Sequence, residues 1–412
     1  MSNVRSTPGA GDATVPIRGL EPEPLHKIPR QRRGGSSAGS TVTDVGFRAA
    51  WPAVAGYAGL RLVSILFLWY FAAEQHKGLL SLLGKYDAIH YAGIVTHGYD
   101  HAIPLKPNGD LAITNLAFFP LYPKLTALFD PILPGGAATA GIVVSWLAGL
   151  AAAWGLFAVG THLRDRRTGI VLAALWAVLP HALVQSMGYT ETLFTALTAW
   201  SLFALLRRRW LTAGLLCMLA GLTRPTGAAL IAVVGIAALI AVCRRQDGWR
   251  PWLAGALAPL GFLGYVVWVG HRLGRADGYF HVQRDAWKMS YDTGAYTLRI
   301  MHTLLVKAQP PAYYVTAIVL LLAVALLALL ITQREQWPLL VYSALVVAMA
   351  FFGDGYFHAK ARLMMPAFPL LLPIAYALAR SPRSARVIVL AALTVISAGY
   401  GTYLALAWPY SP

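Results

Sequence analysis

The chain has 412 residues, of which 57% are hydrophobic and only 12% are charged, and its mean hydropathy is +0.57. This composition excludes a soluble globular protein. A bilayer-spanning helix needs about 20 mostly apolar residues, so the apolar content suffices for roughly ten spans and also excludes a single-pass receptor. The formal net charge of +17 suggests basic residues that set the orientation in the membrane and contact anionic lipid, rather than nucleic-acid binding.

Residues 1–50 are rich in Gly, Pro, Ser, Arg and Ala without apolar periodicity, which predicts a disordered cytoplasmic tail. The first apolar run, 53–73, starts far from the N-terminus and is long enough to span, so we expect an uncleaved anchor rather than a signal peptide. Residues 51–412 are predicted to form one all-α polytopic domain of about eleven transmembrane helices. The other ten segments are 137–160, 169–187, 191–206, 211–223, 226–243, 251–271, 312–332, 338–352, 363–379 and 387–407.

The distribution of basic residues predicts the topology of these segments. Short cytoplasmic loops concentrate Lys and Arg, and with the tail inside, five alternate loops hold thirteen arginines against three acidic residues. The predicted outer side is more evenly balanced. Counting 111–129 as a further span would reverse this bias, so we place that segment outside as an interfacial one. The inner arginines are Arg164, Arg166, Arg167, Arg207, Arg208, Arg209, Arg244, Arg245, Arg250, Arg334, Arg380, Arg383 and Arg386.

Two outer loops are long, at 74–136 and 272–311, and long ordered loops in compact proteins are usually functional. The first contains a carboxylate beside a histidine and aromatic residues. On an interfacial helix, Asp87, His90, Tyr91 and Ile94 would share one face. A carboxylate placed there suits a general base. The alternative is an interfacial belt of tyrosine with a solvated aspartate.

Four sequence blocks follow one another between residues 86 and 227. They are Tyr86-Asp87-x-x-His90-Tyr91-x-x-Ile94-Val95-x-x-Gly98-Tyr99, Ala117-Phe118-Phe119-Pro120-Leu121-Tyr122-Pro123, Gly188-Tyr189-Thr190-Glu191-Thr192-Leu193-Phe194 and Thr223-Arg224-Pro225-Thr226-Gly227. In this order they resemble PIG-V-type mannosyltransferases, which belong to the multi-spanning GT-C glycosyltransferases. The first block has Tyr86 where the family usually has Trp, and a weaker similarity follows at 362–369.

The resemblance implies a GT-C-like fold and transfer of a mannosyl group from polyprenyl-phosphate mannose to an acceptor hydroxyl on the non-cytoplasmic face. It makes Asp87 the catalytic base. The acceptor would be a glycan, glycolipid or protein. Because nucleotide sugars are cytosolic, a carboxylate on the far side needs a donor carried across on lipid.

A departing phosphate also needs cations. Arg224 is the first candidate, since a guanidinium can bind phosphate bidentately, and the alternative is an arginine that snorkels or caps carbonyls. Glu191, at the start of a span, could orient substrate hydroxyls or only favour the helix N-terminus. His90 and Tyr91 are further substrate-binding candidates. Arg362 could meet phosphate or form a salt bridge within the hairpin 353–362.

Basic residues in the second long outer loop suit an anionic donor, although such runs are more often merely solvated. His90, His97 and His101 with Asp87 and Asp100 have no spacing typical of a closed metal site, so no metal or other cofactor is predicted, although a divalent ion remains compatible. Arg61, inside the first span, is expected to snorkel toward the cytoplasm.

Two other functions remain open from the sequence. A transporter or flippase of lipid-linked sugars is the first, although transporters place ionisable residues near mid-membrane and these charges fall in loops. A non-catalytic subunit of an envelope assembly is the second. The Ala-, Arg- and Gly-rich composition suggests a bacterial plasma membrane, with the N-terminus cytoplasmic and the active site extracytoplasmic.

Overall fold

The computed structural model describes residues 45–412, so most of the predicted tail lies outside the described residues. Within that range the secondary structure is helical, apart from two isolated β-bridges. The first helix, α1, begins at Phe47. The all-α prediction is therefore confirmed.

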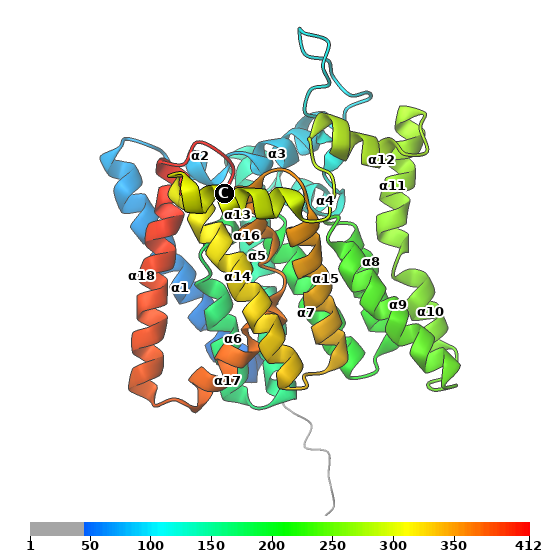
Figure 1. Cartoon of the computed structure of the whole chain (residues 1–412), viewed down its shortest axis with the longest axis vertical. Helices are drawn as coiled ribbons and strands as arrows, with labels where there is room; N and C mark the ends of the chain where they lie inside the picture. Colours follow the sequence, from blue (N-terminus) through cyan, green and yellow to red (C-terminus); the bar gives the residue numbers. More distant parts are fainter. Residues whose placement is uncertain (1–44) are drawn as a thin grey trace, which may run out of the picture. The chain divides into compact units, whose positions relative to one another are not determined.

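Helices run side by side to form the body of the protein (Figure 1). At least one of these helices overlaps each predicted span. They are α1 (Phe47–Glu74), α5 (Gly136–Leu163), α6 (Arg166–Ala177), α7 (Glu191–Leu206), α8 (Trp210–Gly221), α9 (Gly227–Cys243), α10 (Arg250–Leu257), α11 (Leu260–Leu273), α14 (Pro311–Thr332), α15 (Trp337–Phe352), α17 (Leu372–Arg380) and α18 (Arg383–Leu406).

The lengths of these helices refine the count of spans. Within residues 45–412, five stretches are long and apolar enough to cross a bilayer, namely α1, α5, α10 with α11, α14 and α18. A sixth candidate is bent by 77° between residues 357–363 and 368–380, and α7, α8, α9 and α15 are shorter apolar helices. Apolar side chains such as Leu66, Ile318 and Ile396 are exposed on the long helices, as a lipid-facing surface requires. The chain is an integral membrane protein, while eleven complete spans stay a prediction.

The predicted span at 169–187 is wrong as a continuous helix. Helix α6 ends at Ala177, shortly before Pro180, and a short 3₁₀ helix, η2 (Ala182–Ser186), follows. Arg61 of α1 fills this break: its guanidinium donates to the Ser186 hydroxyl at 2.9 Å and to the Ala177 carbonyl at 3.3 Å. Arg61 is 1% exposed, so the expected snorkelling is also wrong.

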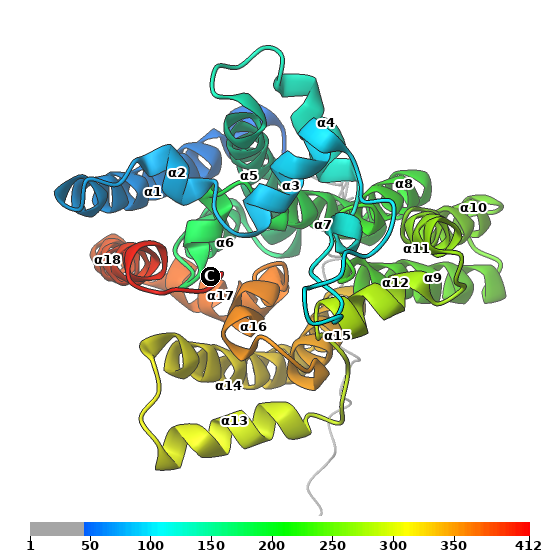
Figure 2. The same ribbon diagram turned by 90° about the horizontal axis from the view of Figure 1, so that it is seen from above.

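Short helices gather at one end of the body, which we call the α3 end (Figures 1 and 2). Helix α4, within the segment predicted to stay outside, has only nine residues and is too short to span. The helices there are α2 (Leu79–Leu83), α3 (Asp87–His97), η1 (Asn115–Ala117), α4 (Leu121–Phe129), α12 (Gly278–His281), η3 (Val282–Ala286), α13 (Ala295–Val306), η4 (Phe357–Ala359) and α16 (Lys360–Leu363).

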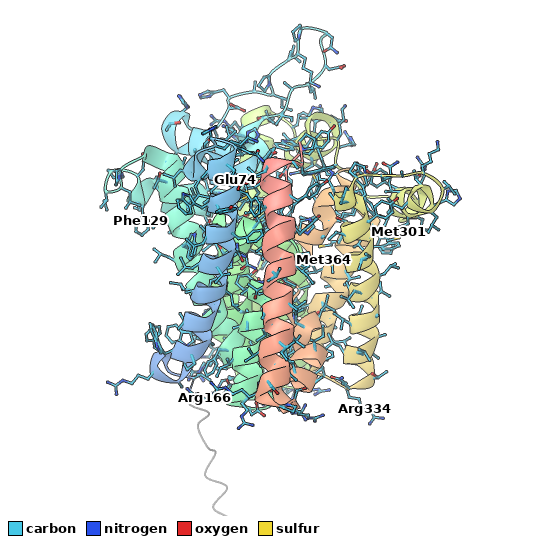
Figure 3. The ribbon with its side chains drawn as sticks, turned by 90° about the vertical axis from the view of Figure 1, so that its left-hand side faces the viewer. Glu74, Phe129, Arg166, Met301, Arg334 and Met364 are labelled. Carbon is cyan, nitrogen blue, oxygen red and sulfur yellow. The ribbon has the colours of Figure 1, made fainter. Side chains whose placement is uncertain are left out.

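The arginine-rich loops lie at the opposite end, which we call the arginine end. Figure 3 places Arg166 and Arg334 there, and Glu74, Phe129 and Met301 at the α3 end. The predicted topology, in which arginine-rich loops alternate along the chain with outer loops, requires the two kinds of loop to lie at opposite ends. The side of the membrane that each end faces stays a prediction.

Candidate active site

The blocks that are separate in the sequence meet at the α3 end. The ring centroids of Tyr91 and Tyr122 are 4.8 Å apart, and the Tyr91 hydroxyl donates to the Thr190 hydroxyl at 3.3 Å. The backbone N–H of Leu121 donates to the Leu222 carbonyl at 3.0 Å, just before the fourth block. The first three blocks therefore pack together, and the second reaches the fourth.

Close backbone packing positions Asp87, the first residue of α3. A Cβ atom on Gly188 would lie 3.0 Å from the Ala88 Cβ, so a side chain there would push α3 away. The Gly188 N–H donates to the Leu83 carbonyl at 3.1 Å, which ties the same segment to α2. Tyr86 precedes Asp87 with a φ of +59°, a strained conformation for a residue with a side chain.

The start of α7 is held just as firmly. The Ser145 hydroxyl of α5 donates to the Tyr189 carbonyl at 2.8 Å and accepts from the Tyr189 N–H at 3.2 Å. The Tyr122 hydroxyl, 2.9 Å from Ser145, also donates to the Gly141 carbonyl at 2.7 Å. These bonds fix the backbone directly before Glu191, so the position of its carboxylate is set by α4 and α5.

Four charged side chains form a continuous network, which we call the charged centre: Asp87, Glu191, Arg224 and Arg362. Arg362 lies between the two acids, with Nη2 3.0 Å from Asp87 Oδ2 and Nε 3.2 Å from Glu191 Oε1. Arg224 Nη1 is 2.5 Å from the same Glu191 oxygen. The four formal charges cancel, and two of the groups reach the network from residues more than 130 positions after Asp87.

Burial differs across the charged centre. The Glu191 side chain is 1% exposed and those of the two arginines are each 10% exposed, whereas the Asp87 side chain keeps 19% of its surface accessible. Buried ions are stable only when paired, because the desolvation of each costs several kcal/mol. Glu191 thus holds the two guanidinium groups in place, and Asp87 is the acid that a substrate can approach.

These contacts bear on the structural alternatives that the sequence left open for Arg362, Arg224 and Glu191. Arg362 does not pair within its own hairpin, since its partners lie on α3 and α7. Arg224 neither snorkels nor caps carbonyls, since it pairs with Glu191 and contacts the Thr190 hydroxyl at 3.4 Å. Glu191 forms ion pairs in addition to lying in the first turn of α7.

His90 lies beside the charged centre rather than in it. Its ring stacks on Phe118 with centroids 5.0 Å apart and meets the edge of Trp287 at 5.5 Å. Burial lowers the pKa of His90 below the usual value, while the charges of Asp87 and Asp100 oppose this effect. A neutral imidazole that packs α3 against η1 and the second outer loop fits these contacts.

Two basic residues of the second outer loop form ion pairs with acids close by in the sequence. Arg275 pairs with Asp277, and Arg284 pairs with Asp285, which also meets His281 at 2.6 Å. The Arg284 guanidinium and the His281 ring help to hold the pKa of Asp285 at about 2. Among the described residues, no three His, Cys, Asp or Glu side chains are grouped as metal ligands.

The sequence did not single out two further partners of Arg362. The Ser411 hydroxyl accepts from Arg362 Nη1 at 3.0 Å and lies 3.2 Å from the Tyr189 hydroxyl. The Arg362 guanidinium also lies over the Tyr189 ring, 5.1 Å from its centroid. The cluster Trp408-Pro409-Tyr410 after the last span, typical of a membrane interface, was the available signal for the Ser411 segment. Figure 2 shows α3, α16 and the C-terminus close together at this end.

No family model and no curated protein matches this sequence. Among solved structures, the chain resembles ArnT from Cupriavidus metallidurans bound to undecaprenyl phosphate, with a TM-score of 0.50 and 14% sequence identity. The likeness covers 82% of this chain, and the chain spans 63% of the length of that one. At this identity the comparison concerns the fold. The described chain therefore has the GT-C-like fold that the sequence predicts, while PIG-V membership stays a prediction.

Proposed function

We propose that this protein is a glycosyltransferase that moves a mannosyl group from polyprenyl-phosphate mannose to an acceptor hydroxyl. The observation that carries the proposal is the charged centre, in which the most accessible acid, Asp87, lies 3.0 Å from a nearly buried arginine. The GT-C-like fold supports a lipid-phosphate donor, and the resemblance to PIG-V-type enzymes supports mannose. A multi-spanning fold with little mass outside the membrane suits a substrate that stays in the bilayer.

Each charged residue of the centre has a task in this reaction. Asp87 accepts the proton of the acceptor hydroxyl as its oxygen forms a bond to the anomeric carbon. The bond from that carbon to the phosphate oxygen breaks, and the electron pair leaves with the lipid phosphate. Arg362 and Arg224 stabilise the charge that develops there. Glu191 orients both guanidinium groups, and Tyr91 holds Thr190 beside Arg224.

The proposal includes a direction across the membrane. The α3 end faces the non-cytoplasmic side, and the arginine end and N-terminus face the cytoplasm, because short arginine-rich loops stay inside. The composition favours a bacterial plasma membrane. Arg362 and Arg224 are the cations in these steps, and the proposal includes no metal.

The test is transfer by the purified protein from labelled polyprenyl-phosphate mannose to acceptors in a membrane lipid extract. The wild type is expected to form a labelled product, and Asp87→Asn to lose about 10²- to 10⁴-fold of the rate, the usual contribution of a general base. Asp110→Asn, at an exposed carboxylate in the same loop, is the matched control and should keep the wild-type rate. Full activity of a folded Asp87→Asn protein would reject the assignment. Movement of the donor across vesicles without product would favour the transporter.

A further inference from the structure

An aromatic cluster lies beside the charged centre and has no part in the steps above. We define it as Tyr313, Tyr356, His358, Trp408 and Tyr410, from α14, the hairpin before α16 and the segment after α18. The His358 ring centroid is 5.3 Å from that of Trp408 and 5.8 Å from that of Tyr410. Tyr313 is 6.0 Å from both His358 and Trp408, and Tyr356 is 6.2 Å from His358.

Two ring nitrogens in the cluster are buried without a hydrogen-bond partner in residues 45–412, Nδ1 of His358 and Nε1 of Trp408. Both side chains are more than nine-tenths buried. An unpaired buried polar group costs about 1 to 3 kcal/mol, and a leucine or phenylalanine would fill such space without that cost. The closed packing of the cluster therefore leaves unused two polar groups that a ligand could satisfy.

The cluster joins the charged centre through the chain segment that carries Trp408 and Tyr410. One residue later, the Ser411 hydroxyl contacts Arg362 and the Tyr189 hydroxyl. The position next to Arg362 thus accepts a hydroxyl group. On the other side, Tyr356 and Tyr410 are 40% and 59% exposed, so the cluster is open there.

These features together match the chemistry of a sugar ring. The apolar C–H face of a hexose packs on aromatic rings, and its hydroxyls pair with ring N–H groups and tyrosine hydroxyls. We propose that the aromatic cluster binds the sugar ring of the lipid-linked donor, with a ligand oxygen replacing Ser411 on Arg362. This inference rests on the proposed function, because the phosphate of the same donor is placed at Arg362 and Arg224.

The experiment compares two probes on the purified full-length protein, polyprenyl phosphate and polyprenyl-phosphate mannose. Trp408→Phe keeps an aromatic ring, although a smaller one, and removes the N–H, so we expect binding of the mannose-bearing probe to weaken roughly 5- to 10-fold, the size of one lost hydrogen bond. Binding of the sugar-free probe should not change. Tyr410→Ala, at a ring that is 59% exposed, should show the same selectivity. Trp249→Phe, at an exposed ring near the arginine end, is the matched control.

If the variants weakened the binding of both probes equally, the inference would be overturned. Unchanged binding of both probes would also overturn it, and is what a simple interfacial aromatic belt predicts. The outcomes separate this inference from the proposed function. Sugar-dependent binding without any transfer product would reject only the enzyme. Transfer with no effect of Trp408→Phe or Tyr410→Ala on the preference for the mannose-bearing probe would reject only the sugar site.

Discussion

The two ends of the protein use arginine in different ways. At the arginine end, Arg208 pairs with Asp247 at 3.1 Å, but its side chain is 55% exposed. At the α3 end, Arg362 and Arg224 are nearly buried and share one carboxylate oxygen of Glu191. Exposed ion pairs contribute about 0 to 1 kcal/mol, whereas a buried network that loses one member is destabilised by about 3 to 5 kcal/mol.

This difference separates topology from chemistry. Arginines at the arginine end need only be present in short loops, because their total charge orients the chain in the membrane. Arg224 and Arg362 at the α3 end need a defined geometry, since each has partners from other parts of the sequence. A cluster of charge is therefore informative about a site when its members are buried and paired across long sequence distances.

The largest expected effect is on stability. Glu191→Gln leaves Arg224 and Arg362 without their shared counter-ion, so we expect a loss of about 3 to 5 kcal/mol and a clear fall in Tm. Arg208→Gln at the arginine end should cost no more than about 1 kcal/mol. Thermal unfolding of both variants in the same detergent measures the contrast. Similar small losses would mean that Glu191 is not a buried counter-ion.

A smaller effect is expected from a change that leaves every charge in place. Gly188→Ala would place a methyl group 3.0 Å from the Ala88 Cβ, so α3 must shift by a few tenths of an ångström. Because a displacement of 1 Å can cost about 10²-fold in rate, we expect transfer to fall roughly 2- to 10-fold with Arg224 and Glu191 still paired. Gly235→Ala is the control, because a Cβ atom there meets nothing within 4 Å. Equal rates for the two variants would contradict the role of this close contact.

The smallest effect is a pH dependence at His90. Burial lowers its pKa, so the folded state favours neutral imidazole. The stabilisation is present above the ordinary pKa of about 6.5 and is lost as pH falls toward the lower folded-state value. We expect Tm to fall more between pH 7.5 and 5 in the wild type than in His90→Phe, which keeps a ring on Phe118. Parallel curves would argue against a buried neutral His90.

The sequence could predict what depends on local pattern. Apolar runs predicted helices in every proposed span, and the interfacial helix on which Asp87, His90, Tyr91 and Ile94 were expected to share one face is α3. The break after Ala177 had a local signal in Pro180 that was passed over, whereas the hydrogen bond from Arg61 that satisfies it comes from a distant helix. Composition and length alone cannot show such long-range partners.

The sequence proposed the four members of the charged centre one by one but not the ion pairs that join them, and their roles in catalysis stay a prediction. Asp87, Glu191, Arg224 and Arg362 were all proposed, but pairing between residues this far apart depends on how α3, α7 and α16 pack. Ser411 was missed for the same reason, since its contact with Arg362 arises only when the segment after α18 folds over this end. Interfacial aromatic residues near a chain end were the one local signal.

The central claim is that Asp87 and Arg362 act as a unit, and a double-mutant cycle on the transfer rate tests it most directly. Groups that work together lose most of their effect with the first substitution. We predict that Asp87→Asn with Arg362→Gln is no slower than Asp87→Asn alone, although Arg362→Gln by itself is strongly impaired. Rate losses that multiply in the double variant would show that the two residues act independently and would contradict this account.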